Sequence, residues 1–185
     1  DRQHHRGGVD LQGGFAELVC VPACATVDVP AGLDFRDAAV VMRHVPTAWN
    51  LLFNVAALKA GETVLVMGAG GNLGSIGIQI AKNVIGATVI AAAGSDERVQ
   101  AGLDLGADHA INYRTQDFVA EVMRLTGQRG VDVVLDMVAG DYLAREVECL
   151  ATDGRIAVIA VQGGSKSALD AGALVVVKRI SNAAL

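Results

Sequence analysis

Short apolar runs recur along the chain, and the segments between them have a different hydrophobic period. The runs cover residues 63–67, 88–93, 110–112, 131–137 and 155–161, and they are rich in Val, Ile, Leu and Ala. Runs of this length that are apolar on both faces are typical of buried strands in a parallel sheet. The pattern therefore predicts five such strands.

The segments between the runs repeat their apolar residues with helical spacing. One predicted helix face consists of Leu73, Ile76, Gly77, Ile80, Ala81 and Val84. The spacing recurs at Phe118, Val122 and Leu125, and again at Leu143, Val147 and Leu150. Gly106 and Gly127 stand where helix C-caps are expected. Because parallel strands need right-handed crossovers, this alternation predicts an α/β fold, a doubly wound parallel sheet with helices on both faces.

The two ends of the chain depart from this alternation. Residues 15–22 are predicted to form a strand that ends at Pro22, and a turn at Pro30 leads to a short predicted helix over residues 34–42. Residues 178–185 resemble a sixth strand that is cut off near its end.

A glycine-rich segment joins the first apolar run to the first helical segment. In the sequence TVLVMGAGGNLGSIGIQIAK, the residues Ala69, Gly71 and Gly74 have the spacing of the G-x-G-x-x-G dinucleotide fingerprint, with Ala in the first position. Ala69 is assigned the tight turn, Gly71 the close approach of backbone to a pyrophosphate, and Gly74 the close packing of helix on strand. N–H groups near Asn72 and Leu73 would face the phosphates.

A strand-to-helix turn without a ligand is the alternative for this segment. The motif follows a buried strand, opens a helix and begins a series of strand and helix alternations, and this context favours nucleotide binding. The end of the second strand, Ala93-Gly94-Ser95, lacks the carboxylate that holds the ribose of NAD. Ser95 and Arg98 could then bind a 2'-phosphate, which favours NADPH over NADH. Alternatively, Ser95 only caps the following helix and Arg98 is solvated.

Composition and charge exclude several other classes of protein. A chain of 185 residues with 52% hydrophobic and only 4% aromatic residues is expected to form one aliphatic core. Its net charge of -5 is spread without a basic run, so no nucleic-acid surface is expected. No apolar run is long enough to span a membrane, and the start DRQHHRGG is not a signal peptide.

The same features predict where the protein is found and how its thiols behave. Because the chain does not begin with Met, processing or truncation is expected. Cys20, Cys24 and Cys149 are an odd number without metal-type spacing, and they are predicted to be buried free thiols in a reducing cytosol. A cytoplasmic protein is expected.

At a larger scale, the sequence resembles the medium-chain dehydrogenase/reductase superfamily, in its zinc-independent NADPH:quinone oxidoreductase branch. The resemblance rests on six segments in the family's order: GGFAELVCVPA, PTAWNLLFNVAALKAGETVLV, AGSDE, LGADHAINYRTQDF, TGQRGVDVVLDMVAGDY and DGRIAVIAVQGGSKS. They span nearly the whole chain. The resemblance implies that residues 1–45 are the tail of a GroES-like substrate domain with a linker, and that residues 46–185 are a Rossmann dinucleotide-binding domain, truncated at its C-terminal end.

The resemblance also implies a set of cofactor contacts. Contact with the phosphates is implied for Ala69, Gly70, Gly71, Asn72, Leu73 and Gly74. Contact with the 2'-phosphate is implied for Ser95, Arg98 and Tyr113. Contact near the nicotinamide is implied for Thr47, for Val138 and the loop after it, and for the segment from Val161 to Gly163. By themselves, Tyr113 is more simply a half-buried strand-end aromatic and Thr47 a helix cap beside Pro46.

Two positions depart from the family's pattern. Asn72 stands where Gly or Ser is usual, although Asn tolerates left-handed geometry. The segment AKNVIGATV is one residue longer than the usual link between helix and strand, so the end of that helix is open.

The implied function is hydride transfer from NADPH to a quinone or another conjugated carbonyl. A zinc-containing alcohol dehydrogenase and an enoyl-thioester reductase remain alternatives, as does a non-catalytic nucleotide-binding module. No catalytic residue can be assigned, and no metal site is expected, because His4, His5 and His44 are better explained as solvated or core histidines. A homodimer is expected, since an apolar face at Trp49, Leu52 and Phe53 and a free sheet edge at residues 178–185 would favour association.

Overall fold

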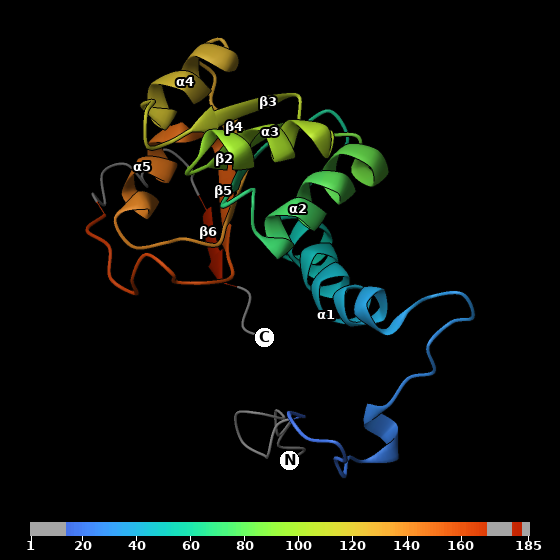
Figure 1. Cartoon of the computed structure of the whole chain (residues 1–185). Helices are drawn as coiled ribbons and strands as arrows, with labels where there is room; N and C mark the ends of the chain where they lie inside the picture. The colour runs from blue at the N-terminus through green and yellow to red at the C-terminus, as the bar shows by residue number, and fades with distance from the viewer. Residues whose placement is uncertain (1–13, 170–178, 183–185) are drawn as a thin grey trace. The chain divides into compact units, whose positions relative to one another are not determined.

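The computed structural model describes residues 14–169 and 179–182 of the chain, which Figure 1 shows whole. Its contacts divide it into two units, residues 1–38 and 39–185. In the described part of the first unit, residues 14–22 form no strand, so the strand predicted there is wrong. A strand needs a neighbour for its ladder hydrogen bonds, and this described part contains no other strand. Its regular structure is η1 (Ala23–Ala25) and the start of α1 (Phe35–Trp49).

The second unit is built on a six-stranded sheet. Its strands are β1 (Thr63–Met67), β2 (Thr88–Ala93), β3 (His109–Asn112), β4 (Val131–Asp136), β5 (Leu150–Val158) and β6 (Arg179–Asn182). Their order is β3-β2-β1-β4-β5-β6, and every neighbouring pair is parallel. The chain builds outward from β1 on one side and from β4 on the other, which confirms the predicted doubly wound sheet.

The strands match the predicted runs closely except at β5. This strand begins at Leu150, which follows α5 directly with extended backbone and pairs with Val131. It ends at Val158, earlier than predicted, because the chain then turns and Gly164 N donates to Val161 O at 2.9 Å. Val161 therefore lies in a turn. The predicted sixth strand is present as β6, and the rest of residues 178–185 lies outside the described residues.

The first long helix is longer than predicted. Asp34 Oδ1 caps α1 by accepting the N–H groups of Arg36 and Asp37, both at 2.8 Å. The helix includes Pro46 and continues as a π-helix, η2 (Asn50–Val55), instead of ending near residue 42. It continues because its far end is apolar and packs on the sheet: Leu51 and Leu52 are fully buried. The expected exposure of Leu52 is therefore wrong.

The remaining helices follow the predicted order along the chain. They are α2 (Asn72–Gln79), the π-helix η3 (Ile80–Ile85), α3 (Asp96–Asp104), α4 (Phe118–Leu125) and α5 (Tyr142–Cys149). Gly106 and Gly127 follow α3 and α4 with positive φ values of 104° and 60°, as predicted for C-caps. The extra residue of the segment AKNVIGATV is accommodated in η3, since a π-helix is wider than an α-helix, and Gly86 ends it with φ 79°.

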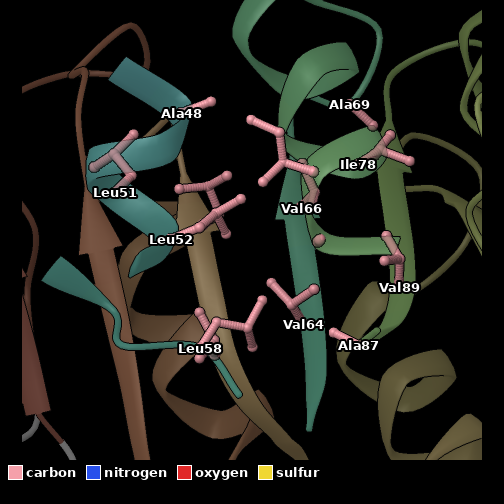
Figure 2. Close-up of a cluster of buried hydrophobic side chains, with 14 of the residues drawn as sticks. Ala48, Leu51, Leu52, Leu58, Val64, Val66, Ala69, Ile78, Ala87 and Val89 are labelled. Atoms are coloured by element: carbon pink, nitrogen blue, oxygen red, sulfur yellow. The ribbon is translucent and has the colours of Figure 1, made fainter. Parts of the chain in front are cut away.

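Alternating side chains of the strands form two cores. Val64 and Val66 of β1 contribute to the core under η2, α2, η3 and α3, while Leu65 and Met67 contribute to the core under α4 and α5. Figure 2 shows part of the first core, where side chains of η2, β1, α2 and β2 meet. Helices therefore cover both faces of the sheet and leave its carboxyl-terminal edge available for a site.

Two further expectations concern membranes and thiols. None of the described helices is both long and apolar enough to cross a membrane. Cys149 is buried in the second core as predicted, but Cys20 and Cys24 are exposed, because the described part of the first unit has no core to bury them. The prediction of buried thiols is therefore wrong for these two residues.

Candidate functional site

Two adjoining cavities lie at the carboxyl ends of the central strands. One, of about 290 Å³, is lined by His44, Gly68, Gly71, Asn72, Leu73, Met137, Val138, Ile159, Ala160 and Gln162. The other, of about 220 Å³, is lined by Gly68, Gly70, Gly71, Ala93, Gly94, Arg98, Tyr113, Val138, Gln162 and Gly163. Because they share four lining residues, we treat them as one groove, the switch-point groove. It lies where the strand order reverses between β1 and β4, the usual ligand position in such sheets.

The glycine-rich turn forms the floor of this groove. Gly68 has φ 71°, and its carbonyl oxygen accepts the N–H of Gly71 at 2.9 Å. Gly68, and not Ala69, is thus the residue that needs left-handed backbone. A Cβ at Gly74 would lie 2.6 Å from Gly68 O and 2.9 Å from the Ala69 Cα. Gly74 therefore packs its helix against the turn, as the spacing predicted.

The N-terminus of α2 opens into the same groove. The first bond of this helix runs from Ser75 N to Gly71 O at 2.9 Å, and no side chain caps the end. The N–H groups of Asn72, Leu73 and Gly74 thus have no intrahelical acceptor. A Cβ at Gly71 would meet only Gly68 O, at 3.3 Å, so the backbone there is open to a ligand. Free N–H groups and the helix dipole make this end suited to an anion such as a phosphate.

Arg98 and Tyr113 form the wall of the smaller cavity. A Cβ at Gly70 would lie 2.6 Å from Arg98 Cγ, so the stem of Arg98 crosses the glycine turn. Similarly, a Cβ at Gly94 would lie 2.9 Å from the Tyr113 hydroxyl oxygen. Among the described residues, the Arg98 guanidinium has no ion pair. Beside the tip of β2, the cavity lining thus contains the Arg98 cation of α3, the Tyr113 phenol that follows β3, and no carboxylate.

Ser95 has the capping role that the sequence left open. Its Oγ accepts the N–H of Arg98 at 3.4 Å, at the start of α3, and it is not among the residues that line the two cavities. The neighbouring Asp96 carboxylate accepts a hydrogen bond from Asn112 Nδ2 at 2.6 Å. This bond holds the carboxylate of Asp96, the first residue of α3, against Asn112 of β3.

The loops after β4 and β5 form the opposite wall. Asp136 Oδ1 accepts the N–H of Val138 at 2.7 Å, and Gly163 N donates to Val138 O at 2.6 Å. A Cβ at Gly140 would lie 2.2 Å from Gly163 O, so the two loops are in close contact. Of the predicted residues on this side, Val138 and Gly163 line the groove and Val161 does not. Thr47 is also outside the lining, and its hydroxyl donates to Arg43 O inside α1.

The sequence did not identify several lining residues. They are His44, Gly68, Met137, Ile159 and Ala160. Most directly follow the carboxyl end of a strand, which is a signal that the strand pattern contained. His44 is different: it comes from α1, its Nδ1 is buried, and no hydrogen-bond partner for it occurs among the described residues.

A metal site is not formed by the part of the chain that the structure describes. No three His, Cys, Asp or Glu side chains gather there in a way that could hold an ion. The donor set therefore does not fit a zinc ion.

Another cavity, of about 530 Å³, lies at the amino end of the sheet and shares no lining residue with the groove. It is lined by Val55, Ala56, Ala57, Lys59, Glu62, Asp153 and Arg155. Within it, Arg155 pairs with Glu62 at 2.7 Å and donates to the carbonyl oxygen of Ala57 at 2.8 Å. Burial raises the pKa of Glu62, but the bonds from Arg155 and the Lys59 N–H outweigh it and lower that pKa overall. Because Arg155 and Glu62 pair with each other and Arg155 also binds backbone carbonyls, we assign a structural role to this cavity.

Comparisons with known proteins agree with this geometry. Residues 72–183 match the family model described as zinc-binding dehydrogenase. The chain is 39% identical over 153 residues to the bovine protein named quinone oxidoreductase-like protein 2, covering 83% of this chain and 44% of that one. It is 37% identical over 147 residues to 2-haloacrylate reductase of a Burkholderia species, covering 78% of this chain and 44% of that one.

A solved structure shows the same fold. The quinone oxidoreductase of Escherichia coli, crystallised with NADPH, matches with a TM-score of 0.79 at 29% identity, over 85% of this chain and 49% of that one. The match to each of the two curated relatives above covers 44% of that protein, so this chain spans less than half of their length. It belongs to the zinc-binding dehydrogenase family, within the quinone oxidoreductase branch of the medium-chain dehydrogenase/reductase superfamily.

Proposed function

We propose that this chain is the NADPH-binding part of an oxidoreductase that transfers hydride to a quinone or another conjugated carbonyl. One observation carries the proposal: beside the tip of β2, the groove that begins at the glycine turn is lined by Arg98 of α3, which has no ion pair among the described residues, and by no carboxylate. A carboxylate there would bind the ribose of NADH and repel a 2'-phosphate. A free guanidinium favours the phosphate.

Each part of NADPH has a matching part of the groove. The open backbone at Gly71 and the free N–H groups of Asn72 and Leu73 would hold the pyrophosphate. Arg98 and Tyr113 would hold the 2'-phosphate, while Ser95 supports them by capping α3.

The nicotinamide would lie toward the other end of the groove. Val138 and Gly163 belong to the loops that line it, and Val161 and Thr47 are proposed near it from the family resemblance alone. The bound cofactor supplies the hydride. This chain supplies orientation, a wall that limits access of water, and polar groups at the phosphates.

Binding in solution tests the cofactor assignment. By titration calorimetry, the chain is expected to bind NADPH more tightly than NADH, and Arg98→Met is expected to weaken NADPH by roughly 10- to 100-fold, as for a charged hydrogen bond. NADH should change little. Arg124→Met is the matched control, since it removes the same charge on α4, away from the groove. Equal affinities for the two cofactors would overturn the proposal.

Two further parts of the proposal concern the whole protein. We propose that residues 1–45 are the tail of a GroES-like substrate domain and that residues 46–185 are the cofactor domain. We also propose a homodimer, supported by Val40, Met42 and Trp49 of α1, which are 44%, 55% and 45% exposed, and by β6 at the edge of the described sheet. Sedimentation of the chain over a range of concentrations tests the dimer.

A further inference from the structure

Two carboxyl groups are buried together beside the loop that follows β4. Asp136 ends β4 and Glu146 lies on α5, and both side chains are fully buried. Burying one ionised carboxylate is costly, and burying two that face each other is more so. We therefore expect that Asp136 and Glu146 are not both ionised in the folded chain.

Asp136 anchors the loop of residues 138–140. Its Oδ1 accepts the N–H of Val138 at 2.7 Å and that of Ala139 at 2.9 Å. Ala139 and Gly140 both have positive φ, at 55° and 62°, so the loop contains a strained non-glycine residue. These hydrogen bonds hold Val138 in the lining of the switch-point groove.

Glu146 is the partner that holds the proton. Neither of its oxygens has a hydrogen-bond partner of ordinary geometry among the described residues, although Asp136 is near enough to act on it through a side-chain hydrogen bond and through charge. Burial, with the Asp136 charge, raises the pKa of Glu146 to about 9. Burial also raises the pKa of Asp136, but two N–H groups and Glu146 oppose this effect. Asp136 is therefore the first of the two to ionise.

We propose that Glu146 is a positioning residue, which donates its retained proton to the Asp136 carboxylate and so fixes residues 138–140 as the nicotinamide end of the switch-point groove. The assignment of that end rests on the proposed function. Loss of the proton would place two like charges side by side in the core. The loop would then lose its fixed anchor, and the groove would change at Val138.

Other ionisable groups near α5 do not replace this pair. Arg145 pairs with Asp117, before α4, at 2.8 Å, and on α4 Arg124 pairs with Glu121. On β5, Arg155 pairs with Glu62. Glu148 is exposed, and Tyr142 packs edge-on against Tyr113. Of these neighbours, Asp136 is the group whose charge acts on Glu146.

The test compares the whole cofactor with its adenosine half. Binding of NADPH and of adenosine 2',5'-bisphosphate is measured by calorimetry at pH 7.5 and pH 10. For the wild-type chain, affinity for NADPH relative to the bisphosphate is expected to fall on the order of tenfold at pH 10, as a hydrogen bond to a charged group is lost. Loss of the fold would weaken both ligands equally.

Two variants at position 146 distinguish the effect of the Glu146 proton from the effect of the side chain's volume. Glu146→Gln keeps a donor that cannot ionise, so its affinity ratio is expected to match wild type at pH 7.5 and to stay constant up to pH 10. Glu146→Leu keeps the volume without the donor and is expected to lower the ratio about tenfold at both pH values. Glu148→Gln, on the exposed face of the same helix, is the control and should follow wild type. A fall at pH 10 in Glu146→Gln equal to that of wild type would overturn the inference.

A second readout does not need the cofactor. The ¹³C shift of the Glu146 carboxyl group and the methyl shifts of Val138 are followed by NMR from pH 6 to pH 10. Both are expected to titrate together near pH 9 in wild type, and the Val138 transition should disappear in Glu146→Gln. If the chain bound neither NADPH nor adenosine 2',5'-bisphosphate, the proposed function would be refuted. The NMR titration would still show whether Glu146 keeps its proton and fixes Val138. A Glu146 carboxyl group that titrates near the ordinary pKa of 4.5 would overturn the inference.

Discussion

The side chain of Arg98 lies against the backbone of Gly70, so closely that a Cβ on Gly70 would be 2.6 Å from Arg98 Cγ. The glycine turn and the first turn of α3 thus share one contact, and the position of the guanidinium depends on the absence of a side chain at residue 70. The sequence placed both residues in the cofactor site but did not show that one sets the position of the other.

Gly70→Ala is therefore expected to displace Arg98 while leaving the fold nearly intact, since the obstructing atoms belong to a flexible side chain. The preference for NADPH over NADH should decrease, and Tm should change little. Calorimetry with both cofactors and a thermal melt measure the two effects. An unchanged preference would show that Arg98 can reach the phosphate from another rotamer.

Gly71 and Gly74 are expected to respond differently to a side chain. Gly71→Val should keep the fold and lose nucleotide binding, because residue 71 lines both cavities and a Cβ there meets only one atom, at 3.3 Å. Gly74→Ala should lower the free energy of unfolding by about 1 to 3 kcal/mol, since its Cβ would overlap backbone. Urea unfolding and a binding assay on both variants separate the effects. Native affinity in Gly71→Val would place the pyrophosphate elsewhere.

Glu146→Gln is expected to stabilise the chain increasingly as the pH rises. Because burial raises the pKa of Glu146 from the ordinary 4.5 to about 9, the folded chain keeps a proton that the unfolded chain releases. The contribution of Glu146 to the free energy of unfolding of the wild-type chain therefore decreases as the pH rises from 4.5 to about 9. The variant should gain up to roughly 1.4 kcal/mol over wild type for each pH unit between pH 5 and pH 9, which amounts to several kcal/mol over this range. Parallel stability curves from urea unfolding would contradict this.

Cys149 is expected to react with thiol reagents only after unfolding. Burial, followed by the nearby Glu146 and Glu148 charges, raises the pKa of its thiol to about 12, so little thiolate forms at neutral pH. Cys20 and Cys24 are exposed and serve as internal references. A colorimetric disulfide reagent should label two thiols in the native chain and the third in denaturant. Rapid labelling of Cys149 in the native state would indicate that the second core opens.

The chain as given is expected to bind NADPH but to reduce quinones and enones very slowly. It spans less than half the length of its curated relatives named above, and one groove wall cannot hold an acceptor against the nicotinamide. Such positioning accounts for about 7 to 11 kcal/mol of a barrier. NADPH oxidation with a simple quinone, followed at 340 nm, measures this. Turnover at an ordinary enzymatic rate, about 1 to 1000 per second, would contradict the expectation.

Prediction from sequence worked best where local chemistry decides the structure. The limits of β1 and β2 and the caps at Gly106 and Gly127 follow from apolar runs and from glycine's backbone freedom, and the structure has them as predicted. It failed where tertiary contacts decide. The helix expected to end near residue 42 continues to Trp49 because the sheet buries its far end, and the expected strand at residues 15–22 has no described neighbour.

In the site, too, features decided by local sequence were predicted and features decided by tertiary contacts were not. The spacing of the motif correctly predicted the packing role of Gly74, but the left-handed turn falls on Gly68, which the motif did not include. Gly140 approaches Gly163 because the loops after β4 and β5 meet, and Asp136 of β4 lies close to Glu146 of α5. Such pairings between distant segments have no signal in a single sequence.

The π-helical turn η3 gives the domain a tolerance to changes in length. Its surplus residue is taken up as local widening, so that Gly86 still ends the helix and β2 still enters the sheet beside β1 with its partners aligned. An insertion in this crossover is thus absorbed before it reaches the tip of β2. Removing one residue from η3 would be expected to give a plain α-helix and an unchanged groove.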